Sequence, residues 1–144
     1  MNTTSTLPPR LAEIIEDFTW AEGREKVELL LEYAEQMPPL PERLAADRDC
    51  MEKVEECMTP VFVKAEAENG RMHFYFDIPP ESPTVRGFAS ILGQGLDGVT
   101  PEQVLAVPND FFQQTGLDQL LTAQRLNGMS AILSHMKRLA AEAL

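Results

Sequence analysis

Cys57 is the side chain in this sequence best suited to covalent chemistry. A thiolate is a strong nucleophile, and an unperturbed cysteine, with a pKa near ~8.5, has only a small thiolate fraction at neutral pH. Cys57 lies between an expected helix and an expected strand, where a side chain can be presented to a partner. The competing interpretation is a buried structural thiol, because free cysteines are among the most buried residues. Position alone leaves both interpretations open.

The other residues that could do chemistry lack partners at a useful spacing. Cys50 precedes Cys57 on the same expected helix and is interpreted as a core or surface filler. The two histidines, His73 and His135, do not stand at ligand spacing from a cysteine, so we expect no bound metal. The sequence has no phosphate-binding or dinucleotide fingerprint, and we expect no cofactor. Arg125, near the expected start of the last helix, is a surface residue by its spacing alone.

The composition indicates one soluble domain with an acidic surface. The 144 residues fit a single domain, 1–144, in which 1–7 are expected to form a flexible tail. The formal net charge of −11 repels phosphate backbones, so we expect no nucleic-acid partner. The same charge fits either simple solubility or an acidic face that docks on a basic partner. The sequence shows no signal-peptide pattern and no apolar run of about 20 residues, and the two cysteines suit a reducing compartment. We therefore expect a cytoplasmic protein with no membrane partner.

The first third of the chain predicts helices. Apolar residues recur at helical spacing over 11–18. Thr19 and Glu22 have the spacing of a capping box for a second helix. A shorter helical stretch is expected over about 42–57. The second helix is expected to bury one apolar face, made of Val27, Leu30, Leu31 and Ala34.

A β-hairpin is the clearest structural signal in the sequence. Residues 61–67 and 72–78 alternate between apolar and polar side chains, as strands with one buried face do. Between them, Asn69-Gly70 supplies the positive φ angles of a tight turn. The sequence therefore predicts two antiparallel strands joined by a short turn.

Helices return after the hairpin. Ser82-Pro83 begins one, which Gly93, Gly95 and Gly98 are expected to break. Thr100 begins a capped helix, and the last helix starts near Thr122. Helices, a small antiparallel sheet and further helices together predict an α+β domain.

The segment around Cys57 resembles the active-site segment of a known family. Residues 54–62, from Val54 to Phe62, are similar to that segment in the SufE family of sulfur-acceptor proteins. Other patterns of the family follow in order, so that the resemblance covers nearly the whole chain. They are Met37 to Pro41, Val85 to Phe88, Leu96 to Glu102, Phe111-Phe112 with Gly116-Leu117, and Arg125 to Met129.

The resemblance implies both a fold and a role. The fold would be helices packed on one side of a small antiparallel sheet, as in SufE and NifU-like proteins. The role would be that of a sulfur-transfer accessory protein rather than a stand-alone enzyme. Cys57 would take persulfide sulfur from a cysteine desulfurase of the SufS type, stimulate that enzyme and relay sulfur to an iron–sulfur scaffold complex. Pyridoxal phosphate would be bound by the desulfurase.

The same resemblance assigns two site residues and shows two departures. Cys57 matches the persulfide-forming cysteine of the family, and Arg125 matches an arginine that lies near it. The family often has Gly where this chain has Glu56, and usually has Gln where it has Met58. The acidic neighbour would raise the Cys57 pKa, whereas a nearby Arg125 would lower it.

Two alternatives stand beside sulfur transfer. An iron–sulfur scaffold would need about three metal-binding residues near the sheet. A non-catalytic interaction module would keep its cysteines for structure. The sequence leaves open which desulfurase and which scaffold are the partners, and whether the protein forms a homodimer.

Overall fold

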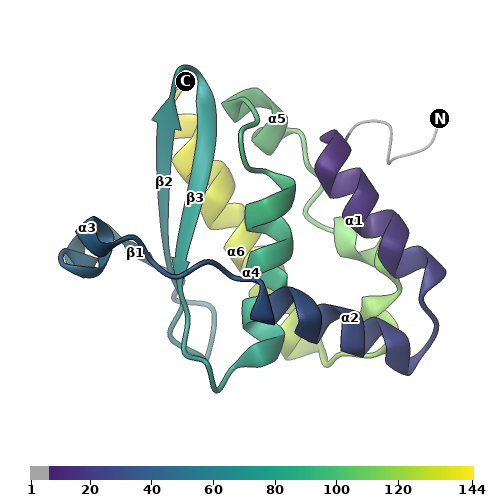
Figure 1. The fold of residues 1–144 in the computed structure, drawn as a ribbon. Helices are drawn as coiled ribbons and strands as arrows, with labels where there is room; N and C mark the ends of the chain where they lie inside the picture. The colour runs from purple at the N-terminus through teal and green to yellow at the C-terminus, as the bar shows by residue number, and fades with distance from the viewer. Residues whose placement is uncertain (1–6) are drawn as a thin grey trace.

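The computed structural model describes residues 7–144, apart from the side chains of Arg48 and Gln114, and it has the expected α+β fold (Figure 1). The expected tail over 1–6 lies outside the described residues, whereas Leu7, which we counted in that tail, is buried. The elements follow in the order α1 (Pro9–Trp20), α2 (Arg24–Glu35), α3 (Glu42–Ala45), η2 (Arg48–Cys50), β1 (Glu52–Lys53), β2 (Phe62–Glu68), β3 (Arg71–Asp77), α4 (Pro83–Gly95), α5 (Pro101–Leu105), η3 (Phe111–Thr115), η4 (Leu117–Gln119) and α6 (Ala123–Glu142), where η marks a 3₁₀ turn.

The sheet is antiparallel, in the order β1-β2-β3. The predicted turn between β2 and β3 is confirmed, because Asn69 and Gly70 have φ angles of 54° and 79°. The predicted inner face of β3 is also buried. β1 is short and pairs with only the first two residues of β2, through Glu52 with Val63 and Lys53 with Phe62. Most of β2 therefore has one strand neighbour, β3.

The loop that follows α4 bonds to the outer edge of β3 near the start of that strand, at Met72. The Met72 N–H donates to the Val99 carbonyl at 2.7 Å, and the Gly98 N–H donates to the Met72 carbonyl at 2.7 Å. Arg71 adds a hydrogen bond from its guanidinium to the Gly98 carbonyl at 2.8 Å. These bonds satisfy backbone groups that an open strand edge would leave to another chain.

α4 is the central helix of the domain and packs against α1, α2, α6 and β3, as its position in Figure 1 shows. Two glycines let its neighbours approach closely. A Cβ at Gly87 would stand 2.5 Å from the Leu30 carbonyl oxygen, and one at Gly95 would stand 2.7 Å from a Leu11 methyl carbon. Of the three glycines expected to break this helix, Gly93 lies inside it, and α4 ends at Gly95.

The capping prediction is confirmed for α5 and wrong for α2, and α6 starts beside Thr122 as expected. At α5 the Thr100 hydroxyl accepts the Gln103 N–H while the Gln103 side chain accepts the Thr100 N–H, which completes a capping box. At α6 the Thr122 hydroxyl accepts the Arg125 N–H. Thr19 instead lies inside α1, where its hydroxyl donates to the Ile15 carbonyl, and α2 begins after Gly23.

The helix predicted over about 42–57 starts at Glu42 as expected but is much shorter. α3 ends at Ala45, a 3₁₀ turn follows, and the chain is already extended in β1 by Glu52. On α2 the predicted apolar face is partly wrong, because Leu31 is 38% exposed and Tyr33 is buried in its place. Among residues 7–144, no helix has the length and apolar character needed to cross a lipid bilayer.

Candidate functional site

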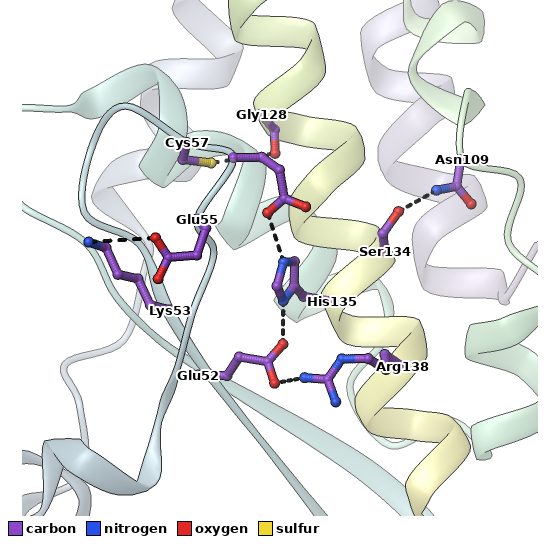
Figure 2. Close-up of polar contacts among 10 residues, drawn as sticks. Glu52, Lys53, Glu55, Cys57, Asn109, Gly128, Ser134, His135 and Arg138 are labelled. Carbon is purple, nitrogen blue, oxygen red and sulfur yellow. Dashed lines mark hydrogen bonds and ion pairs between the residues drawn. The ribbon is translucent and has the colours of Figure 1, made fainter.

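Cys57 lies in the loop that joins β1 to β2. The loop is closed at its base by a hydrogen bond from the Val54 N–H to the Val61 carbonyl, 2.8 Å long. Within it, the Cys57 N–H donates to the Val54 carbonyl at 3.2 Å and forms a tight turn. The expected junction of a helix and a strand is therefore a strand-to-strand loop. This loop places the thiol beside α6 (Figure 2).

The thiol is half-buried against a glycine of α6. Cys57 Sγ donates a weak hydrogen bond to the Gly128 carbonyl oxygen, 3.7 Å away. A Cβ at position 128 would stand 3.4 Å from that sulfur, at the limit of ordinary contact. Glycine inside a helix costs about 1 kcal/mol relative to alanine. We infer that Gly128 gives Cys57 room beside the helix.

A cavity of about 300 Å³ opens next to the sulfur. Cys57 and Arg125 both line it, so the structure brings the two predicted site residues together. Thr59 and Ser82 join two of its walls through a contact of 3.2 Å between their hydroxyl oxygens. The cavity is lined by three segments of the chain, namely Cys57 to Thr59, Glu81 to Val85 with Phe88, and residues of α6 from Gln124 to Ile132.

The surroundings of Cys57 keep its thiol protonated. Burial raises the pKa of the Cys57 thiol, and the negative charge of the adjacent Glu56 raises it further. Both effects disfavour the thiolate, because a buried or negatively flanked sulfur loses stabilisation when it becomes charged. Arg125 is exposed at the first turn of α6.

A charged network ties the Cys57 loop and β1 to α6. The His135 ring lies between two carboxylates, with Nδ1 against Glu52 and Nε2 2.9 Å from Glu56. Arg138, one turn further along α6, pairs with the second oxygen of Glu52. The hydrogen bond with His135 is the main cause that lowers the pKa of the Glu56 carboxyl. Figure 2 shows the ring of His135 pointing from α6 toward Glu52.

The remaining candidates lie away from this cavity. Cys50 is exposed at the end of η2 and is not among the residues that line the cavity. His73 is on β3, with Nδ1 2.7 Å from an Asp97 oxygen. Across residues 7–144, no three or more histidine, cysteine, aspartate or glutamate side chains are grouped so that they could hold a metal ion.

Sequence reasoning missed several residues of the site. Gly128 belongs to the segment that resembles the family pattern, so its presence beside Arg125 was a usable signal. Ser82 was assigned only to the start of a helix, and its contact with Thr59 depends on how the chain folds back. His135 was considered only as a metal ligand. Its two carboxylate partners are far away in sequence, so no local pattern could have found them.

The fold and the site define a class of protein, namely a small α+β domain that presents one cysteine thiol to a cavity. A family model described as the SufE Fe-S metabolism associated domain matches residues 12–140. A SufE-like protein of Mycobacterium tuberculosis is 44% identical over 144 residues. The aligned residues make up 99% of this chain and 99% of that protein. The chain therefore belongs to the SufE family, whose domain is associated with iron–sulfur metabolism.

Two further comparisons agree with this membership. The sulfur acceptor protein CsdE of Escherichia coli is 32% identical over 110 residues, which cover 75% of this chain and 71% of that protein. The solution structure of a hypothetical protein from Thermus thermophilus matches with a TM-score of 0.85 and 39% identity, covering 95% of this chain and 97% of that one.

Proposed function

We propose that this protein accepts sulfur on Cys57 from a cysteine desulfurase, stimulates that enzyme and passes the sulfur on toward iron–sulfur cluster assembly. The observation that carries the proposal is the place of Cys57, half-buried at the edge of a cavity in a member of the SufE family. Two relatives are named for such a role, the sulfur acceptor protein of Escherichia coli and the cysteine desulfuration protein of Plasmodium vivax.

The transfer is a thiol–persulfide exchange. The Cys57 thiolate attacks the terminal sulfur of a persulfide on the desulfurase, and a new bond forms between the two sulfurs. The bond inside the donor persulfide breaks, and the donor cysteine leaves as a thiolate that takes up a proton. No net oxidation occurs, because one sulfur–sulfur bond replaces another. The desulfurase would carry the pyridoxal phosphate that generates its own persulfide.

The cavity suits this exchange because it offers space beside the accepting sulfur. A sulfur atom added to Cys57 has to occupy volume next to Sγ, and the cavity of about 300 Å³ begins there. A water molecule takes up only about 30 Å³ of liquid, so a persulfide sulfur fits well within it. Met58, which is 82% exposed, offers a partner an apolar contact next to the reacting residue.

The raised pKa of Cys57 fits a carrier that is unreactive until it meets its donor. At neutral pH the free protein keeps the thiol protonated, so oxidants and stray electrophiles react with it slowly. Docking on the desulfurase would bring the donor persulfide and change the surroundings of the thiol. The thiolate would then form where it is needed.

The first prediction is that Cys57→Ser abolishes sulfur uptake. Serine has no thiol, so no persulfide can form at this position. The protein is incubated with a cysteine desulfurase and cysteine, and its intact mass is measured. We expect the wild type to gain the mass of one sulfur atom and Cys57→Ser to gain none.

Cys50→Ser is the matched control, because Cys50 is an exposed free thiol that does not line the cavity. This variant should take up sulfur as the wild type does. Equal loss in both variants would contradict uptake on Cys57 alone and favour a relay between two cysteines. Stoichiometric iron in the purified wild type would favour a scaffold role instead.

A further inference from the structure

We propose that His135 is a positioning residue for Cys57, and that its ring, held between Glu52 and Glu56, fixes the Cys57 loop against α6. The inference rests on the proposed function in taking Cys57 as the reacting residue. It concerns the free protein, however, and can be tested without any sulfur transfer. His135 makes no contact with the cavity and acts through Glu56, the residue directly before Cys57.

Three elements meet at the His135 ring. Glu52 comes from β1, Glu56 comes from the Cys57 loop, and His135 projects from α6. The ring is mostly buried, with 17% of its side chain exposed, and Glu52 is 25% exposed. The ring therefore bridges the start and the tip of the segment that carries the thiol.

The bridge is complete only while both ring nitrogens carry a proton. An ionised carboxylate accepts hydrogen bonds and cannot donate them, and a neutral imidazole has a single N–H. Nδ1 faces Glu52 and Nε2 faces Glu56, so a neutral ring can serve only one of the two. The charged groups around the ring are Glu52, Glu56 and Arg138.

Glu56 is the partner that a neutral ring would release. Arg138 also pairs with Glu52, so Glu52 keeps a cation when the ring loses a proton. A proton left on Nδ1 preserves the Glu52 bond, and Nε2 then turns a lone pair toward the Glu56 carboxylate. The contact next to Cys57 is consequently the one that depends on the charge of His135.

The two other polar contacts described between this loop and α6 involve sulfur atoms and are weaker hydrogen bonds. A thiol is a poor donor, and Cys57 bonds to the Gly128 carbonyl at 3.7 Å. Gln124 contacts the sulfur of the exposed Met58. A hydrogen bond between two ions is roughly twice as strong as one between neutral groups. Loss of the Glu56 bond should therefore loosen the loop more than loss of either other tie.

Hydrogen–deuterium exchange of the full-length protein tests this role. Peptides covering 52–60 are compared with peptides from α4 in the wild type and in variants, all at the same pH. We expect the protection of 52–60 to fall several-fold when the bond between His135 and Glu56 is removed. The same measurement in a Cys57→Ser background removes any effect of thiol ionisation.

Four variants separate charge from shape. His135→Gln offers one donor group and should lower the protection of 52–60. His135→Lys keeps a cation with several donors and should hold the protection. Glu56→Gln should lower it, whereas Glu55→Gln should behave as the wild type does, because Glu55 pairs with Lys53 and not with His135.

Unchanged α4 peptides show that a variant is folded, which separates local opening from unfolding. Equal protection of 52–60 in the wild type and in His135→Gln would overturn the proposal. Loss of protection in His135→Lys equal to that in His135→Gln would also overturn it, because charge would then play no part. If the wild type took up no sulfur, the proposed function would be wrong. The hydrogen–deuterium exchange result would still decide whether His135 positions the loop.

Discussion

At the scale of single residues, the site sets a protonated thiol beside an exposed cation. Burial and the Glu56 charge both raise the pKa of Cys57 in the free protein. Arg125 lines the same cavity and can meet negative charge that enters it. A persulfide on Cys57 brings such charge, since persulfides are more readily ionised than thiols. We therefore propose that Arg125 acts mainly on the sulfur-loaded form.

The second prediction concerns Arg125 directly. Arg125→Ala should slow sulfur uptake several-fold, because the cavity then lacks the cation that would favour a persulfide anion on Cys57. Alkylation by iodoacetamide probes the unloaded thiol and should change less than uptake does. Arg125→Lys should recover part of the uptake rate, because it restores the charge without the planar donor pair. The measurements are uptake by mass spectrometry and alkylation rate against pH.

Arg10→Ala is the control for lost positive charge, since Arg10 is an exposed arginine of α1 that does not line the cavity. It should leave both measurements unchanged. Superimposable uptake and alkylation curves for Arg125→Ala and the wild type would mean that Arg125 serves only its helix.

At the scale of elements, the first turn of α6 supports the site. The Thr122 hydroxyl caps this turn by accepting the Arg125 N–H at 3.3 Å. Further along the same helix stand Gly128 beside the thiol and His135 beside Glu56. One helix thus carries Arg125, Gly128 and His135, which line the cavity or contact the Cys57 loop.

The third prediction compares two helix caps. Thr122→Ala and Thr100→Ala should each cost about 1 kcal/mol of unfolding free energy, the usual value for a lost N-cap. Thr122→Ala should also slow sulfur uptake, because the turn that holds Arg125 frays. Thr100 caps α5, away from the cavity, so Thr100→Ala should leave uptake unchanged.

Urea unfolding measures the free energies, and the desulfurase assay measures uptake. If Thr122→Ala is destabilised but takes up sulfur at the wild-type rate, the first turn of α6 is dispensable for transfer. If the two variants lose the same unfolding free energy, any difference in their sulfur uptake cannot come from lower stability.

Local patterns in the sequence predicted those elements whose signals are local. Asn69-Gly70 specifies a tight turn by its backbone preferences, and Thr100 with Gln103 caps a helix within four residues. Cys57 and Arg125 were assigned through a resemblance spread along the chain, and both line the cavity. Predicting these elements and assigning these two residues did not require knowledge of which distant residues are in contact.

The misses arose where distant residues decide the local structure. β1 exists because Glu52 and Lys53 pair with β2, and two residues carry no strand pattern of their own. Leu31 was expected inside, but the packing of α2 on α4 turns Tyr33 inward instead. The bridge from His135 to Glu56 joins residues 79 positions apart. No window of sequence could have shown it.

At the scale of the whole molecule, the net charge of −11 opposes compaction. Like charges on a folded surface repel one another, and salt screens that repulsion. The Debye length falls from about 30 Å at 0.01 M salt to about 10 Å at 0.1 M. The several ion pairs at the surface are short-range and weaken less over this range than the general repulsion does.

The fourth prediction follows from this balance. The melting temperature should rise by a few degrees as sodium chloride increases from about 0.01 M to about 0.1 M, because screening relieves repulsion in the folded state. Differential scanning fluorimetry over a salt series measures the change. A melting temperature that falls with salt would show that the ion pairs, such as Arg43 with Glu66, outweigh the net repulsion.

The short reach of β1 has a consequence for how the protein behaves when concentrated. β1 covers only the first two residues of β2, so the backbone of β2 from Lys64 onward lies at the rim of the sheet. A bare rim of this kind invites the strand of another chain to add to it and seed aggregates. Here the side chains of Lys64, Glu66 and Glu68 place charge beside that rim, and Arg43 pairs with Glu66. An incoming strand would have to strip water from these charges, so the rim resists self-association.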